Sequence, residues 1–88
     1  MKVRKIKITN KLGLHARPSA LLVKAATKYR SDFFIEKDGM RVNGKSIMGV
    51  MMLAAEYGSN LDILADGIDA EVLLNEIEQL FTSNFDED

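Results

Sequence analysis

One short tract, Gly13-Leu14-His15-Ala16-Arg17-Pro18-Ser19, contains the only histidine and the only proline of the chain. A neutral imidazole can accept and release a chemical group near pH 7, and the planar N–H donors of Arg17 match phosphate oxygens. Pro18 suits the first turn of a helix, where the backbone N–H groups of Ala16 and Arg17 would be free to bind an anion. The tract therefore predicts a phosphohistidine site. His15 would accept and donate the phosphoryl group, and Arg17 and the two backbone groups would stabilise its charge.

A single histidine in a small protein also has a simpler interpretation. His15 could be a helix cap in a small α/β module that binds a ligand or regulator without covalent chemistry, and Arg17 would then have no required role. A single-stranded nucleic-acid binder is a weaker alternative, because the exposed aromatic platform that such binding needs is not evident.

The composition limits the other classes of protein. At 88 residues and 47% hydrophobic content, residues 1–88 are expected to form one domain with a modest core. There is no cysteine, and no metal or other cofactor is expected.

The N-terminus lacks the apolar segment of a signal peptide, and no apolar run approaches the ~20 residues of a membrane span. The formal net charge of −1, with basic residues near the start and Asp86-Glu87-Asp88 at the end, argues against nucleic-acid binding. We expect a cytoplasmic monomer without membrane insertion.

The pattern of apolar residues predicts the elements that must position the tract. Alternation predicts four strands, around Ile6 and Ile8, Phe33 and Ile35, Met40 to Val42, and Leu61 to Ala65. In the first strand, the basic residues are expected on the solvated face. Asp38-Gly39 predicts a hairpin turn between the second and third strands.

Three helices are expected between and after these strands. The first should run from Ala16 to Tyr29, with Ala20, Val23 and Thr27 among its buried positions. Ser46 should cap a short second helix, and Asp69 should cap a third that buries Leu73, Ile77, Leu80 and Phe81. The order is βαββαβα, which predicts an α+β fold with a four-stranded antiparallel sheet and three helices on one face.

Ile47, Met48 and Met51 follow Ser46 in a helix too short to turn all of its apolar residues inward. Methionine side chains adapt readily to different partners. These residues could equally be core or contact surface, and part of this helix is expected to be exposed.

Two motifs in register, GLHARPS and NGKSIMGVMMLAA, resemble the histidine-containing phosphocarrier protein family, HPr, and the likeness extends over essentially the whole chain. The resemblance implies an open-faced β-sandwich. It also implies that enzyme I phosphorylates His15 on Nδ1, with phosphoenolpyruvate as the ultimate donor, and that the group passes to EIIA-type domains. The segment that contains Ile47, Met48 and Met51 would then help to recognise these partners. The protein would be a transiently phosphorylated carrier rather than a free-standing enzyme.

The resemblance also gives Ser46 a second interpretation beside that of a helix cap. In some members of the family, HPr kinase/phosphorylase modifies this position, and a transcriptional regulator uses the modified form. Met52 replaces the serine common in that branch, which weakens the inference of a regulator. The MMLAA segment and the ending LFTSNFDED resemble regulatory members, including the nitrogen-related branch NPr. The sequence leaves open whether the phosphoryl group drives sugar import or stops at a regulatory EIIA protein.

Overall fold

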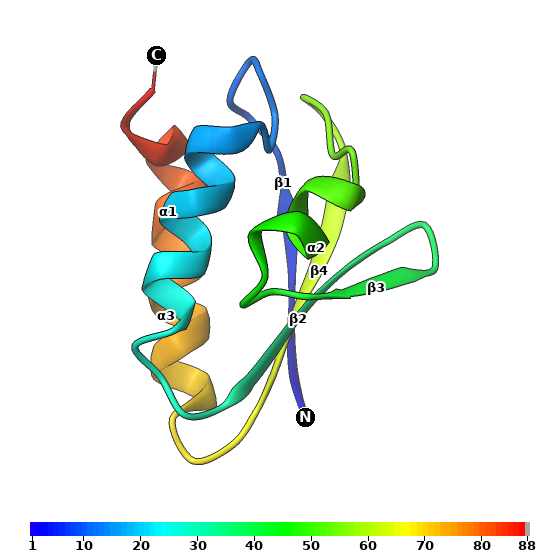
Figure 1. Cartoon of the computed structure of the whole chain (residues 1–88). Coiled ribbons are helices and arrows are strands. Elements are labelled where there is room, and N and C mark those ends of the chain that lie inside the picture. The colour runs from blue at the N-terminus through cyan, green and yellow to red at the C-terminus, as the bar shows by residue number, and fades with distance from the viewer. Residues whose placement is uncertain (88) are drawn as a thin grey trace.

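The computed structural model of the chain describes residues 1–87 (Figure 1), so that Asp88 of the acidic end lies outside it. The elements appear in the expected order, βαββαβα, followed by a short 3-10 turn, η1. Their bounds are β1 Lys2–Lys7, α1 Ala16–Ala26, β2 Asp32–Lys37, β3 Met40–Asn43, α2 Ile47–Met52, β4 Asn60–Asp66, α3 Ala70–Thr82 and η1 Asn84–Asp86. Within the described residues, no helix has the length and hydropathy to span a lipid bilayer.

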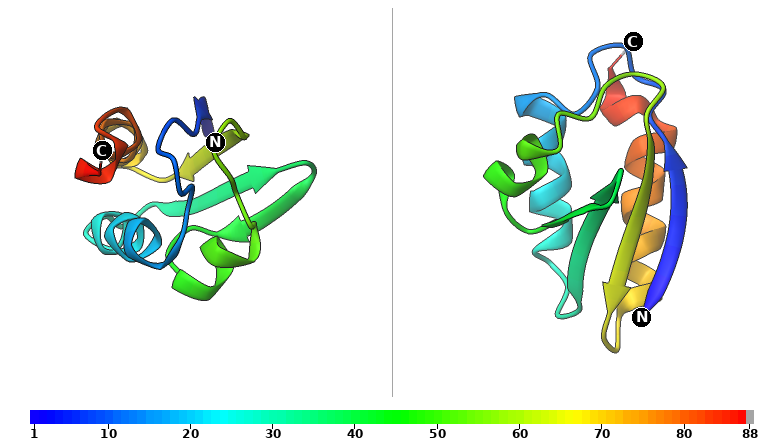
Figure 2. Two further views of the ribbon diagram at one scale, coloured as in Figure 1. Left: turned by 90° about the horizontal axis from the view of Figure 1, so that it is seen from above. Right: turned by 90° about the vertical axis from the view of Figure 1, so that its right-hand side faces the viewer.

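The four strands form one antiparallel sheet in the order β1-β4-β2-β3, with the last strand of the chain inserted between the first and the second. The helices lie on one face of this sheet, and the other face is open (Figures 1 and 2). This arrangement confirms the α+β open-faced sandwich. The expected turn at Asp38-Gly39 joins β2 to β3, and both of its residues have positive φ, as a tight hairpin requires.

The alternation of the strands places their apolar side chains between the sheet and the helices. Buried residues of β2 and β4 meet buried residues of α1 and α3 there; the core includes Phe33, Ile35, Leu61, Ile63, Ala65, Leu22, Leu73 and Ile77. Leu64 is a further buried side chain of β4, although its position in the alternation puts it on the open face. Its neighbours in register are Val3 and Phe34, so that a small apolar cluster also forms there.

The first helix differs from its prediction in its end and in two of the three positions expected to be buried, whereas Val23 is buried as predicted. It ends at Ala26, with Thr27 as the C-cap, and Ala20 and Thr27 are exposed. Among the buried residues are Ser19, Leu22 and Ala26. Ser19 can be buried because its hydroxyl donates a hydrogen bond to the carbonyl oxygen of Leu14 at 3.1 Å. Alanine and threonine carry too little apolar surface to fix the rotation of a helix, which contacts with α2 and α3 determine instead.

Asp69 occupies the N-cap position of α3, but its side chain makes no capping hydrogen bond. The carboxylate accepts hydrogen bonds from the backbone N–H groups of Arg30 and Ser31, both at 2.9 Å, and from the Ser31 hydroxyl. The Ser31 hydroxyl and the Arg30 N–H together lower the pKa of Asp69 to about 2. The residue therefore connects α3 to the segment that follows α1, which sequence reasoning did not anticipate.

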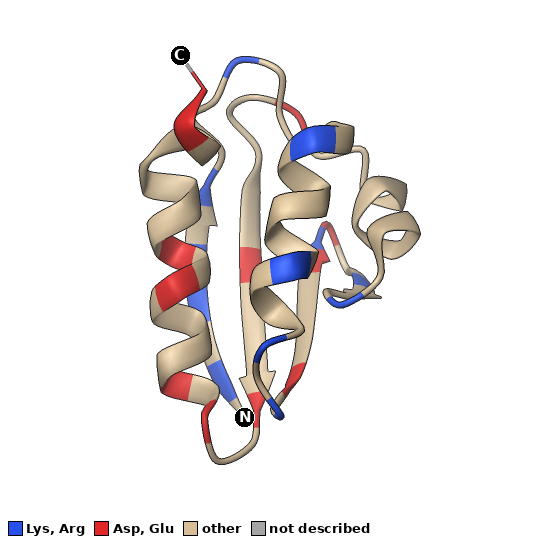
Figure 3. Ribbon diagram, turned by 60° about the vertical axis from the view of Figure 1, so that its left-hand side comes forward, with Lys and Arg blue, Asp and Glu red and all other residues tan. Residues whose placement is uncertain are grey.

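Arg4 also departs from the prediction that the basic residues of β1 lie on the solvated face. Its guanidinium contacts the carboxylates of Glu71 and Glu78 on α3, the latter at 2.7 Å. Figure 3 shows acidic residues along α3 beside the basic residues of β1. The side chain points toward the helices because Arg4 has the same alternation parity as Ile6.

Candidate functional site

The tract that contains His15 begins with a backbone conformation that only glycine adopts easily. Gly13 has a φ of +65°, and a Cβ atom at this position would lie 2.3 Å from the carbonyl oxygen of Ala55. The next residue, Leu14, donates a backbone hydrogen bond to the same oxygen at 2.9 Å. The segment after α2 therefore fixes the approach of the chain to α1.

His15 is the N-cap residue of α1, and its carbonyl oxygen accepts a hydrogen bond from the N–H of Ser19 at 3.0 Å. Its side chain does not cap the helix, and 35% of that side chain is exposed. The N–H groups of Ala16 and Arg17 lie in the first turn and have no acceptor among residues 1–87. Pro18 has no N–H to satisfy. The start of α1 therefore presents an accessible imidazole beside two free backbone donors.

The imidazole of His15 contacts a carboxylate from the far end of the chain. Its Nε2 atom lies 2.8 Å from Oε2 of Glu87. An ionised carboxylate can only accept a hydrogen bond, so Nε2 carries the proton and donates it. In a neutral imidazole, Nδ1 is then unprotonated. Glu87 thus selects the tautomer in which Nδ1 has a free electron pair.

Two further side chains of the site hold the C-terminal segment. Nη1 of Arg17 donates to the carbonyl oxygen of Phe85 at 3.0 Å and lies 3.5 Å from Oε2 of Glu87. Nδ2 of Asn10 donates to Oε1 of Glu87 at 3.2 Å and to the carbonyl oxygen of Gly13 at 2.8 Å. Desolvation raises the pKa of Glu87, but the hydrogen bonds from Asn10 and His15 outweigh this effect and lower the pKa overall. The carboxylate therefore stays ionised in contact with the imidazole.

A buried aromatic residue anchors this segment to the core. Phe85 is fully buried and packs edge to face on Phe81 of α3, with ring centroids 5.0 Å apart. The three residues of η1, Asn84–Asp86, all have positive φ, which turns the chain back toward α1. Sequence reasoning missed Glu87 and Asn10. The only signal for Glu87 was a phenylalanine inside an otherwise acidic and polar ending, because a large apolar side chain needs a buried place.

Ser46 caps α2 as predicted, since its Oγ accepts a hydrogen bond from the N–H of Gly49 at 3.1 Å. Ile47 is 44% exposed, Met48 78% and Met51 43%. These three residues form an apolar surface, here called the α2 patch. The helix packs against α1 (Figure 1), so that the patch belongs to the same side of the molecule as the helix that begins at His15.

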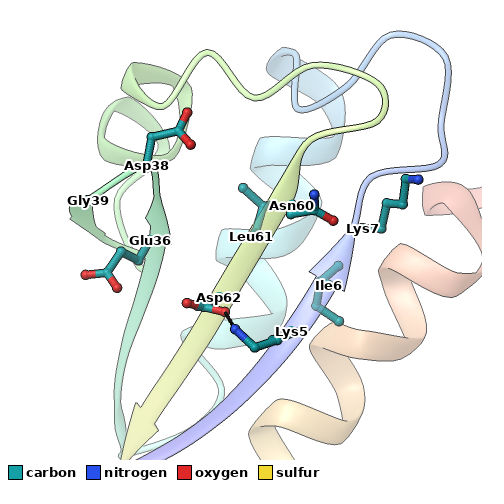
Figure 4. A pocket seen from close by; sticks show the side chains of 9 residues that line it. All are labelled: Lys5, Ile6, Lys7, Glu36, Asp38, Gly39, Asn60, Leu61 and Asp62. Atoms are coloured by element: carbon teal, nitrogen blue, oxygen red, sulfur yellow. Dashed lines mark hydrogen bonds and ion pairs between the residues drawn. The ribbon is translucent and has the colours of Figure 1, made fainter.

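A hollow lies elsewhere, on the open face of the sheet (Figure 4). Charged side chains of β1, β4 and the β2–β3 hairpin line it, and Lys5 is paired with Asp62 at 3.4 Å. No residue of the His15 tract contributes to this hollow. Residues 1–87 contain no group of three or more histidine or carboxylate side chains placed to hold a metal ion.

Comparison with known proteins identifies the family. A sequence model for the PTS HPr component phosphorylation site matches residues 2–83. The phosphocarrier protein HPr of Treponema pallidum is 44% identical over 88 residues, which cover 100% of both chains. The crystal structure of HPr-C-His from Thermoanaerobacter tengcongensis has 44% identity and a TM-score of 0.96, covering 100% of this chain and 99% of the other. An HPr dimer from the same organism has 45% identity and a TM-score of 0.80, covering 99% and 100%. The chain belongs to the HPr family of phosphocarrier proteins of the phosphotransferase system.

Proposed function

We propose that this protein accepts a phosphoryl group on Nδ1 of His15 from enzyme I and passes it to EIIA-type domains. The contact between Nε2 of His15 and Glu87, at 2.8 Å, is the observation that carries the proposal. It leaves Nδ1 as the nucleophilic nitrogen of the neutral imidazole. The free N–H groups of Ala16 and Arg17 and the Arg17 guanidinium lie at the same helix start, where a phosphoryl group on His15 would need them.

The transfer forms one bond and breaks one. Nδ1 attacks the phosphorus atom in line, the N–P bond forms, and the bond from phosphorus to the donor breaks. The imidazole becomes positively charged, and Glu87 stabilises this charge through the proton on Nε2. Arg17, whose side chain is 54% exposed, can turn from the Phe85 carbonyl oxygen toward the phosphoryl oxygens. Transfer to an acceptor reverses these steps and restores the neutral imidazole.

The test is incubation of the purified protein with phosphoenolpyruvate and enzyme I, followed by mass spectrometry. The wild-type protein should gain one acid-labile phosphate, and His15→Ala should gain none while unfolding at an unchanged temperature, because His15 lies outside the core. Arg17→Ala should slow the transfer far more than the matched variant Lys24→Ala, since Lys24 lies further along the exposed side of the same helix. Acceptance of phosphate by folded His15→Ala would contradict the proposal.

We further propose that the α2 patch docks enzyme I and that phosphorylation of Ser46 by an HPr kinase/phosphorylase regulates this docking. A phosphate adds about −1.5 to −2 charges at pH 7, here at the start of α2 and beside apolar side chains. The modification would weaken docking without unfolding the helix. Ser46→Asp should therefore raise the apparent KM for His15 phosphorylation, with an effect that shrinks at high salt. An unchanged KM for authentic phospho-Ser46 protein would refute the regulatory role and leave Ser46 as a cap.

We propose that the protein is a single-domain cytoplasmic monomer of residues 1–88 that works without a metal or other cofactor and without nucleic acid or membrane insertion. A monomer would leave His15 and the α2 patch open to partner proteins, whereas the HPr dimer of Thermoanaerobacter tengcongensis shows that a relative can associate. Light scattering in solution distinguishes the two states.

Transfer assays against a sugar-permease EIIA and a regulatory EIIA would decide between a sugar carrier and an NPr-like carrier. We also propose, as a partner, a transcriptional regulator that binds the Ser46-phosphorylated form.

A further inference from the structure

Three of the five methionines lie on the six-residue helix α2. Met48 is 78% exposed, Met52 66% and Met51 43%. Met48 and Met52 are four residues apart and therefore lie above one another on the same helix face. Both side chains are therefore accessible to small molecules in solution.

The helix itself depends on other residues. Val50 is fully buried, and Leu53, the C-cap residue, is 3% exposed. The Ser46 hydroxyl closes the other end of the helix through the N–H of Gly49. A change of polarity at Met48 or Met52 would therefore alter the surface of α2 while leaving its attachment to the core intact.

We propose that Met48 and Met52 form a site of reversible oxidation to methionine sulfoxide by peroxides, and that this modification weakens the docking of enzyme I. The thioether sulfur attacks one oxygen of the peroxide, an S–O bond forms and the O–O bond breaks. The sulfur is oxidised by two electrons, and hydrogen peroxide is reduced to water. The product is a polar side chain that accepts hydrogen bonds. The modification deepens the proposed function, because Met48 belongs to the α2 patch proposed to bind enzyme I and Met52 extends the exposed apolar surface of the same helix beside that patch.

The physical reason for weaker docking is the loss of apolar contact. A flexible methionine can adapt to a partner surface, and the removal of its thioether from water costs little free energy. A sulfoxide oxygen buried at the same place would need a hydrogen-bond donor that a surface complementary to a thioether does not provide. Methionine sulfoxide reductases reverse the reaction, so that the change would act as a switch.

Met40 is the internal control, because it is 46% exposed but lies at the start of β3. The full chain is treated with graded hydrogen peroxide, and the sites of oxidation are mapped by peptide mass spectrometry. Met48 and Met52 should oxidise at least as fast as Met40. The apparent KM of enzyme I for the treated protein should rise at least fivefold, while the midpoint of thermal unfolding stays unchanged. Treatment with methionine sulfoxide reductase should return the KM to its original value. Slower oxidation of Met48 and Met52 than of Met40 would overturn the site.

Two variants test whether the rise in KM comes from oxidation of Met48 and Met52. Each variant is compared with its own untreated form, so that any change in its basal rate cancels. The double variant M48L/M52L should lose the peroxide effect on KM, and Met40→Leu should keep it in full. An unchanged KM after complete oxidation of Met48 and Met52, or an equal rise in KM for treated M48L/M52L, would overturn the switch. If the untreated wild-type protein accepts no phosphate from enzyme I, the proposed function fails instead. The order of oxidation still tests the site in that case.

Discussion

Two carboxylates, one near each end of α1, hold the chain by hydrogen bonds of different kinds. Asp69 lies near the C-terminal end, where two of its three donors are backbone N–H groups and the third is the Ser31 hydroxyl. Glu87 lies near the N-terminal end, where all of its partners are side chains, those of Asn10, His15 and Arg17. Backbone donors cannot turn away to another partner, whereas side chains can. A carboxylate can therefore fix the fold or belong to a candidate functional site, depending on which groups donate hydrogen bonds to it.

The pKa of both carboxylates is lowered, but the consequences differ. At Asp69 the hydrogen bonds from Ser31 and Arg30 lower the pKa to about 2, so that the charge persists in moderately acidic solution. At Glu87 desolvation opposes the hydrogen bonds, although the pKa is still lowered overall. Both carboxylates are therefore ionised at neutral pH. Only Glu87 contacts a group that changes its own charge during the proposed reaction.

The largest expected effect comes from removing the anchor of the Glu87 contact. Phe85→Ala should lower the free energy of unfolding by about 3–5 kcal/mol, because it empties a fully buried aromatic site. It should also detach Glu87 from His15, which the chemical shifts of the imidazole would show. Denaturant unfolding provides the stability measurement. The matched variant Asp86→Asn, next to Phe85 but exposed, should change neither quantity. A preserved His15–Glu87 contact in Phe85→Ala would show that the contact does not depend on the core.

Asp69→Asn should have the second largest effect and act on stability alone. The neutral amide has one carbonyl oxygen in place of a charged carboxylate with two, so we expect the midpoint of thermal unfolding at pH 7 to fall by several degrees while phosphorylation of His15 keeps its rate. The folded-state pKa of Asp69, about 2, lies below its ordinary value of 3.8. The stabilisation is therefore present above pH 3.8 and is lost as the pH falls toward 2.

The difference in midpoint between the wild-type protein and Asp69→Asn should accordingly shrink over that acidic range. Asp66→Asn is the matched control, because Asp66 is exposed at the end of β4. A slower phosphorylation of Asp69→Asn, with its stability unchanged, would reverse the distinction between the two carboxylates.

Glu87→Gln should have the smallest effect on stability and a clear effect on rate. A glutamine oxygen can still accept the proton of Nε2, but without a charge it stabilises the imidazolium less. We expect phosphorylation of His15 to slow about tenfold in single-turnover measurements, with an unfolding midpoint that falls less than that of Asp69→Asn. Asp86→Asn again serves as the control. A faster reaction would mean that competition between the carboxylate and the phosphoryl group for Arg17 outweighs the effect on the imidazole.

Local patterns in the sequence were sufficient for much of this protein. Alternation in Phe33 and Ile35 and in Leu61, Ile63 and Ala65 predicted the buried faces of β2 and β4, because successive side chains of a strand point to opposite faces. Ser46 was identified as a cap, since serine satisfies N–H groups within a single turn. The glycine and proline around His15 predicted the start of α1 for the same reason. Each of these predictions depends on interactions between residues that are close in the sequence.

The tertiary structure alone decided the contacts between distant residues. Glu87 reaches His15 across 72 positions, and Asp69 turns from its own helix to the backbone near Ser31, 38 positions away. The rotation of α1 also depended on its packing, because alanine and threonine gave no strong preference for either side. A polar side chain has several possible partners of similar energy, and no local pattern states which of them the folded chain brings within hydrogen-bond distance. The sequence therefore determined the proposed nucleophile, His15, and the elements that carry it, and the packing of the C-terminal segment against the start of α1 determined which carboxylate contacts it.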